Sequence, residues 1–147
     1  MTKTNNFPAT DMWHWKNKLP FPHTVVVGDQ VFISGQQTLD GNGVVLNPGD
    51  IAAQTHNVFE NMKKCLAMLD MELSDLVRLN TYYVFEGNDT DATAYWEDMT
   101  RVRLEYFPDP GPVATAVRVK GMPYKDQLIQ IEGVALKIGR ASCRERV

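Results

Sequence analysis

Three prolines within five residues, Pro108-Asp-Pro-Gly-Pro112, constrain the fold of this chain more than any other feature. Proline cannot continue the hydrogen-bond ladder of a helix, so a helix that reaches this segment must end there. The residues before it, about 91–106, place apolar side chains at helical spacing, which predicts an amphipathic helix. Residues 113–120, which follow it, are rich in β-forming types and predict a strand. A helix and a strand therefore meet across a short, rigid break.

The elements before and after this unit follow from similar patterns. Two β-branched runs, joined by a turn with glycine at its first central position, predict a hairpin over 24–34. Asp50 is a candidate N-cap for a helix that runs to about Met71. Further strands are expected over 76–85 and 128–137.

The predicted order is β-β-α-β-α-β-β, which indicates an α/β fold: one mixed sheet with two helices on one face. The strands carry apolar residues on both faces, so we expect the second face to be buried by oligomerisation.

Composition places the chain among ordinary globular proteins. Its 147 residues are 44% hydrophobic and 22% charged, which excludes a disordered chain and a coiled-coil rod. The formal net charge is −3, so the chain lacks the basic footprint of a protein that binds nucleic acid or an anionic membrane. The N-terminus resembles no secretory signal, and no apolar stretch is long enough to span a bilayer, so a cytoplasmic protein is expected.

The last ten residues, 138–147, differ from the rest of the chain. They contain three arginines and a cysteine directly after an apolar strand pattern. A back-translation of 137–147 reads like a common sequencing adapter, so we expect a non-native tail; the alternative is a natural basic C-terminus. The expected organisation is therefore a single domain over 1–137 with a net charge of −5 and one cysteine, Cys65.

Searches for the usual catalytic motifs find none. The three histidines are scattered and lack the one-turn spacing of a zinc helix, so no metal site is expected. Ser34 stands in Ile-Ser-Gly-Gln and not in the Gly-x-Ser-x-Gly motif of a nucleophile elbow.

Several strings, in order and spacing, resemble the Rid family, also called the YjgF or endoribonuclease L-PSP family. The resemblance covers about residues 20–137, and its strings are Val31-Phe-Ile-Ser-Gly-Gln36, Gln54-x-x-Asn57 with Asn61, Asp75-Leu-Val77, Tyr106-Phe107, Pro112-Val-Ala-Thr-Ala-Val-Arg-Val119 and Ile129-Gln-Ile-Glu-Gly-Val-Ala135.

The resemblance implies a homotrimer with a central barrel, helices outside and ligand clefts at the subunit interfaces. It also implies hydrolysis of small imines and enamines, such as 2-aminoacrylate, to a ketoacid and ammonia. In the family an arginine grips the substrate carboxylate, and guanidinium suits that bidentate contact.

Carried over residue by residue, the family's cleft is altered here. Ala114, followed by Thr115, stands where the arginine belongs, and Phe21 stands where a tyrosine is usual. Thr100 replaces a common asparagine, Gln130 replaces a glutamate that positions water, and Ser34 matches. These small and apolar replacements favour a larger or less anionic ligand.

Strand alternation suggests which residues could compensate. Ala114, Ala116 and Arg118 share one strand face, so Arg118 could replace the missing arginine; alternatively it pairs across strands with Glu132 and binds nothing. Gln130 and Glu132 share one face of the strand expected over 128–137, which we expect to lie next to the strand that carries Arg118.

Two positions near the predicted hairpin complete the candidate site. Ser34 and the amide of Gly35 could hydrogen-bond a substrate oxygen, or the serine could bond only to the backbone. His23 could relay protons at the mouth of the first strand, or it could be a loop residue.

The leading functional reading is a hydrolase of C=N bonds in small metabolites. Water is placed by Glu132 or Gln130, Ser34 and backbone amides polarise the substrate, and no cofactor is required because an imine carbon is already electrophilic. The alternatives are a non-catalytic trimer that binds a small molecule and, as the weakest, a ribonuclease.

Overall fold

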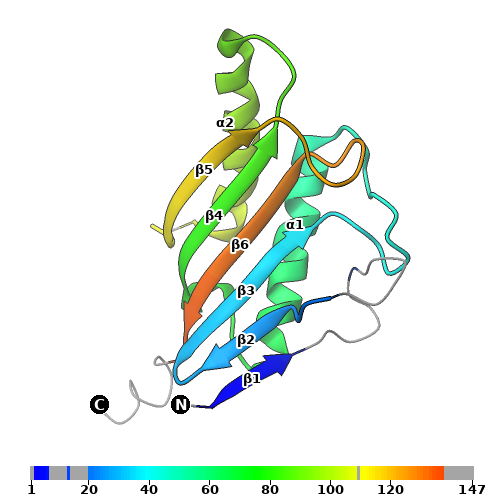
Figure 1. The fold of residues 1–147 in the computed structure, drawn as a ribbon. Coiled ribbons are helices and arrows are strands. Elements are labelled where there is room, and N and C mark those ends of the chain that lie inside the picture. The colour runs from blue at the N-terminus through cyan, green and yellow to red at the C-terminus, as the bar shows by residue number, and fades with distance from the viewer. Residues whose placement is uncertain (1, 7–12, 14–19, 109, 138–147) are drawn as a thin grey trace.

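The computed structural model describes residues 2–6, 13, 20–108 and 110–137. Its elements are β1 (Lys3–Asn6), β2 (Thr24–Val27), β3 (Gln30–Gln37), α1 (Ile51–Ala67), the short 3₁₀ helix η1 (Leu73–Asp75), β4 (Leu76–Val84), α2 (Asp89–Tyr106), β5 (Val113–Val119) and β6 (Ile129–Leu136). Two helices pack on one face of a six-stranded mixed sheet, as expected (Figure 1). The predicted tail, 138–147, lies outside the described residues.

The strands are ordered β1-β2-β3-β6-β4-β5 across the sheet. Only the β4–β5 pair is parallel, and α2 forms the crossover between these two strands. β6 therefore lies between β3 and β4, and β5 is an edge strand. This corrects the expectation that β5 and β6 are neighbours, because β4 separates them.

β1 was not predicted from the sequence. Its four residues, Lys-Thr-Asn-Asn, are polar and carry no alternating pattern, yet they pair antiparallel with β2. Long-range pairing outweighs a weak local preference for strand here.

The core lies between the sheet and the two helices. α1 begins at the N-cap Asp50, whose side chain accepts a hydrogen bond from the amide of Ala53. It buries an apolar face against the alternate residues of β3, β4 and β6 that point toward the helices. The largest fully buried apolar side chains of this layer are Phe59, Met62, Leu66, Leu79, Ile129 and Ile131.

α2 covers less of the sheet than its apolar stripe predicts. Only Met99 and Val102 of this helix are buried, whereas Trp96 keeps 42% of its surface exposed. The helix lies over the β5 edge and extends past the sheet in Figure 1, so part of its stripe meets no strand.

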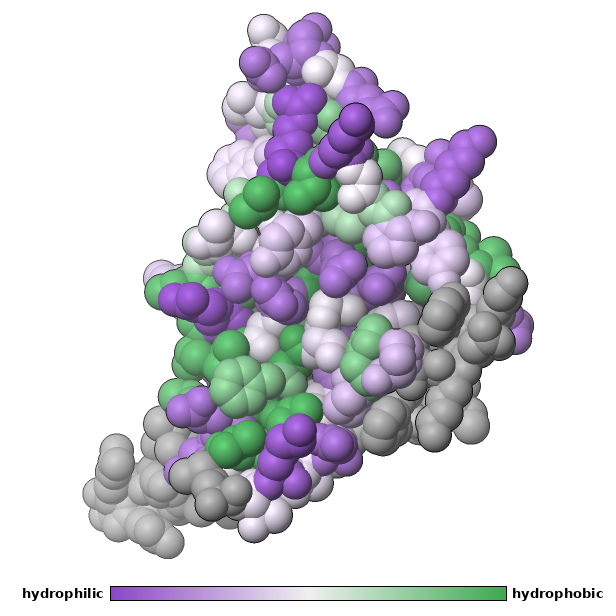
Figure 2. Space-filling model, in the orientation of Figure 1, coloured by the Kyte–Doolittle hydropathy of each residue, from purple (hydrophilic) through white to green (hydrophobic). Residues whose placement is uncertain are grey.

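The other sheet face is covered by neither helix. Figure 2 views this face, which mixes apolar and hydrophilic groups. Its exposed apolar side chains include Phe32, Val113 and Val117.

The reactivity of the buried Cys65 thiol measures how well the core excludes solvent and reagents. Burial raises the pKa of its thiol from 9.0 to about 12, and only the thiolate reacts readily with disulfide reagents. In a Cys143→Ser background, we predict that Ellman's reagent at pH 8 labels folded protein far more slowly than protein unfolded in guanidinium.

The raised pKa of Cys65 also makes the free energy of unfolding depend on pH. The pKa is raised by folding, so this contribution is complete below pH 9 and is lost as the pH rises toward 12. The Cys65→Ala variant, as a control, should show a shallower fall in unfolding free energy over that range. Equal labelling rates for folded and unfolded protein would contradict the buried placement.

Candidate functional site

A β-bulge in β3 brings together the candidate residues of the open sheet face. Ile33 pairs with Gly133 and Gln36 pairs with Ile131, so two residues of β3, Ser34 and Gly35, oppose one residue of β6. That residue is Glu132. Bulges of this kind re-aim side chains and are over-represented next to active sites.

The hydroxyl of Ser34 already donates its hydrogen bond to the backbone. Its hydroxyl donates to the carbonyl oxygen of Pro22 at 2.8 Å, and its amide donates to the carbonyl of His23 at 2.9 Å. The alternative that this serine bonds to backbone is therefore observed. The Oγ lone pairs can still accept a hydrogen bond, so Ser34 is suited to accept from a ligand N–H rather than to donate to a carbonyl.

Gln130 lies directly against Gly35. A Cβ atom built on Gly35 would come within 2.0 Å of Nε2 of Gln130, so any larger residue there would displace the amide. Glycine at this position is thus a condition for the placement of Gln130 beside the bulge.

Glu132 is held by two donors from β4. Its Oε1 atom accepts from Nδ2 of Asn80 at 3.3 Å and from the hydroxyl of Tyr82 at 3.1 Å. The hydrogen bond and the negative charge of the carboxylate raise the pKa of Tyr82. Sequence reasoning missed Asn80 and Tyr82, although their alternation on one strand was a usable signal.

The second group of candidates lies on the opposite face. Ala114 and Ala116 of β5, together with Thr100 of α2, line a cavity of about 300 Å³ between that helix and the sheet. Thr115 also borders this cavity, although its strand position is on the open face with Asn80 and Glu132. The register explains the separation: Asn80 pairs with Glu132 on one side and Thr115 on the other, so Ala114 and Ala116 point to the helix face. Within one copy of the chain, the two groups do not form one cleft.

Arg118 neither lines this cavity nor pairs with Glu132. Its guanidinium donates to the carbonyl oxygens of Phe85 and Gly87 and pairs with Asp89 at 3.2 Å. Arg118 thus fixes the segment between β4 and α2. The expected pairing with Glu132 is wrong, because β4 lies between β5 and β6. The other expectation, that Arg118 replaces the missing arginine, stays a prediction.

His23 and Phe21 also lie differently from expectation. His23 is fully buried. Its ring centre lies 4.8 Å from that of Trp13 in an edge-to-face arrangement, and its Nδ1 lies 3.3 Å from Nε2 of Gln36. His23 lies in a bend directly before β2, so the alternative of a loop residue is observed, and this loop residue is buried in the core instead of lining an open cleft mouth. Phe21 is 38% exposed, directly before the Pro22 carbonyl that holds Ser34.

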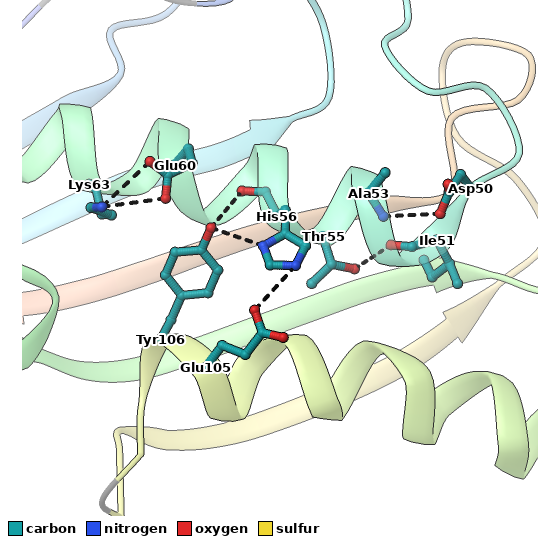
Figure 3. A network of polar contacts seen from close by, with 9 residues as sticks. All are labelled: Asp50, Ile51, Ala53, Thr55, His56, Glu60, Lys63, Glu105 and Tyr106. Atoms are coloured by element: carbon teal, nitrogen blue, oxygen red, sulfur yellow. Dashed lines mark hydrogen bonds and ion pairs between the residues drawn. The ribbon is translucent and has the colours of Figure 1, made fainter.

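A polar network fixes α2 against α1 (Figure 3). Nδ1 of His56 lies 3.2 Å from the hydroxyl of Tyr106, and Nε2 lies 3.3 Å from Oε2 of Glu105. Burial and the nearby Glu60 raise the pKa of Tyr106, so its hydroxyl stays protonated. This network links the last turn of α2 to α1.

The cavity contains one charged residue that sequence reasoning missed, Arg103 of α2. Arg103 comes three residues after Thr100, which itself comes four residues after Trp96. This spacing places all three on one helix face. That spacing was the signal available in the sequence.

Among the described residues, no group of three His, Cys, Asp or Glu side chains could hold a metal ion. None of the helices described is long and apolar enough to cross a membrane.

Comparison with known proteins gives consistent results. The family model for endoribonuclease L-PSP matches residues 15–137. A RutC family protein of Pyrococcus horikoshii is 35% identical over 118 residues, which cover 80% of this chain and 87% of that protein. The 3-aminoacrylate deaminase RutC of Acinetobacter baylyi is 34% identical over 116 residues, 79% of this chain and 86% of that protein.

A solved structure shares the fold. A crystal structure of a Thermotoga maritima protein superposes with a TM-score of 0.77 at 28% identity, and the match covers 92% of this chain and 99% of that one.

The contact between Gly35 and Gln130 can be tested by a double-mutant cycle. We predict that Gly35→Ala destabilises the protein by about 1–3 kcal/mol, the range for overpacking, because the new methyl group collides with the amide. In a Gln130→Ala background the same change should cost much less. Denaturant unfolding measures both values.

Gly121→Ala is the matched control, because a Cβ there meets no atom within 4 Å. An equal cost for Gly35→Ala with and without Gln130 would show that the two residues do not contact each other.

Proposed function

Because this chain belongs to the endoribonuclease L-PSP family, we propose that it hydrolyses the C=N bond of small imines, including those formed from enamines, and releases ammonia. The observation that carries the proposal is the bulge that sets Ser34 and Gly35 opposite Glu132 and beside Gln130. A relative with 34% identity is a 3-aminoacrylate deaminase, which acts on an enamine.

The chemistry requires water, an acceptor for its proton and a contact that orients the substrate nitrogen. Water adds to the electrophilic imine carbon, a proton passes to the nitrogen, and ammonia leaves as the carbonyl forms. We assign proton acceptance from water to Glu132, whose other carboxylate oxygen is held by Asn80 and Tyr82. Gln130 orients the water. No cofactor is needed for this sequence of steps.

Ser34 takes a role different from the one expected from sequence. Its proton is engaged with Pro22, so its oxygen accepts a hydrogen bond from the substrate N–H and orients the C=N bond. The backbone N–H of Gly35 remains the candidate hydrogen-bond donor to the oxygen that water adds to the imine carbon.

A complete site needs two copies of the chain. The Glu132 group and the cavity at Ala114 lie on opposite sheet faces, so a second protomer must bring them together. We propose a homotrimer in which Thr100, Ala114, Thr115 and Ala116 of one protomer face the Ser34 bulge of the next, near Phe21. The edge strand β5 supports this, because Val113 and Val117 are 64% and 43% exposed.

The oligomeric state can be measured directly. We predict that size-exclusion chromatography with light scattering gives three times the mass of one chain. Val117→Glu should shift the protein toward smaller species, since it places a charge on the open face. Leu104→Glu, at an exposed apolar position on α2 (57%, against 43% for Val117), is the control and should leave the trimer intact. A monomer at micromolar concentration would contradict the two-copy site.

Ammonia release from enzymatically generated imines tests the activity. We predict that Glu132→Gln lowers kcat by about 100- to 10,000-fold, the usual contribution of general acid–base catalysis. Ser34→Ala should have a smaller effect, because it removes one orienting contact. The exposed Glu86→Gln and Ser74→Ala are matched controls and should keep full activity.

Release no faster than in buffer, across carboxylate-bearing and neutral imines, would refute the hydrolase. Tight ligand binding without such release would instead support a non-catalytic binding trimer.

A further inference from the structure

The cavity beside β5 contains a cation even though Ala114 replaces the family's arginine. Arg103, from the last turns of α2, lines it together with Ala114, Thr115 and Thr100. Among the described lining residues it is the one that carries a formal charge. It therefore decides which ligands the cavity can take.

Arg103 is anchored next to the position of the missing arginine. One terminal nitrogen donates to the carbonyl oxygen of Pro112 at 2.9 Å, two residues before Ala114. The guanidinium carbon lies 5.8 Å from the ring centre of Phe107. These contacts hold the head group at the end of β5 and leave donors of the guanidinium for a ligand.

No carboxylate pairs with Arg103 among the described residues, whereas its neighbour Arg101 pairs with Glu97 and Asp98. Arg103 is half-buried, and burial lowers its pKa. A partly desolvated cation without an ion pair is stabilised when an anion binds beside it.

We propose that Arg103 binds the carboxylate of the substrate in this cavity and replaces, from the helix, the arginine that Ala114 lacks on the strand. This inference rests on the proposed function and names its substrate class: imines derived from 2-amino acids. Of the two ligand types expected from the sequence, a larger one or a less anionic one, it favours the larger.

The size of the cavity extends the assignment. Small side chains at Ala114 and Ala116 leave a volume of about 300 Å³, walled by Trp96 and Met99. With the carboxylate on Arg103, the remainder of the ligand meets apolar walls. The preferred substrates are therefore 2-imino acids with an apolar side chain longer than one carbon.

A kinetic comparison of paired substrates tests the role of Arg103. Imines are generated by an amino-acid oxidase from norvaline and, chemically, from its uncharged amide. We expect Arg103→Gln to lower kcat/KM for the carboxylate substrate by about 10- to 100-fold, as for loss of a hydrogen bond to a charged group. The change should fall mainly on KM, and the amide substrate should be little affected.

Arg101→Gln is the matched control, two residues away on the exposed side of the same helix, and should behave as the wild type. Arg103→Lys keeps the charge but not the bidentate geometry, so it should lie between the wild type and Arg103→Gln. Thermal unfolding of each variant checks the fold. If Arg103→Gln does not fold, the ratio of the two substrates in Arg103→Lys decides the question.

Equilibrium binding of 2-oxopentanoate, measured by calorimetry, separates this inference from the proposed function. Weaker binding by Arg103→Gln, but not by Arg101→Gln, supports the inference even where no imine is hydrolysed. Hydrolysis with unchanged carboxylate preference in both Arg103 variants would overturn the inference and leave the hydrolase standing.

Discussion

The placement of both helices on one face of the sheet is the constraint on which the rest of the molecule depends. The parallel β4–β5 pair requires a crossover, and α2 supplies it on the face already covered by α1. Phe59, Met62 and Leu66 then fill one core between the layers. The opposite face keeps polar and apolar side chains exposed, so the same topology that completes the core leaves the surface on which the proposed trimer depends.

This division also separates the chemistry into two parts. The open face carries the bulge at Ser34 and Glu132, to which the acid–base role is assigned in the proposal, and the helix face carries an apolar cavity with Arg103. Neither part alone can both orient a substrate and activate water. In the proposed trimer, catalysis depends on assembly for a geometric reason: residues of opposite sheet faces meet only across an interface.

The elements were predictable where local patterns are strong, as for the helix that ends before Pro108 and the hairpin around Gly28. β1 was not, because its polar residues carry no strand pattern and pairing with β2 decides its structure. The order of β5, β4 and β6 is likewise a long-range property. Without it, Arg118 and Glu132 could be placed together, whereas a strand separates them. The burial of His23 depends on Trp13 and Gln36, which no local pattern connects to it.

The proposed move of the cation from strand to helix changes what controls substrate binding. An arginine at position 114 would be fixed by the β4–β5 ladder, which is hydrogen-bonded along its length. Arg103 instead depends on the position of α2, and that helix is held to α1 through Tyr106, His56 and Glu105 on a partly exposed surface. α2 also buries Met99 and Val102 in the core, so side-chain packing and not a hydrogen-bond ladder positions it on the sheet. In the proposed trimer, the packing of α2 on α1 therefore positions the carboxylate contact of one protomer, and the subunit interface sets its distance from the β-bulge of the next.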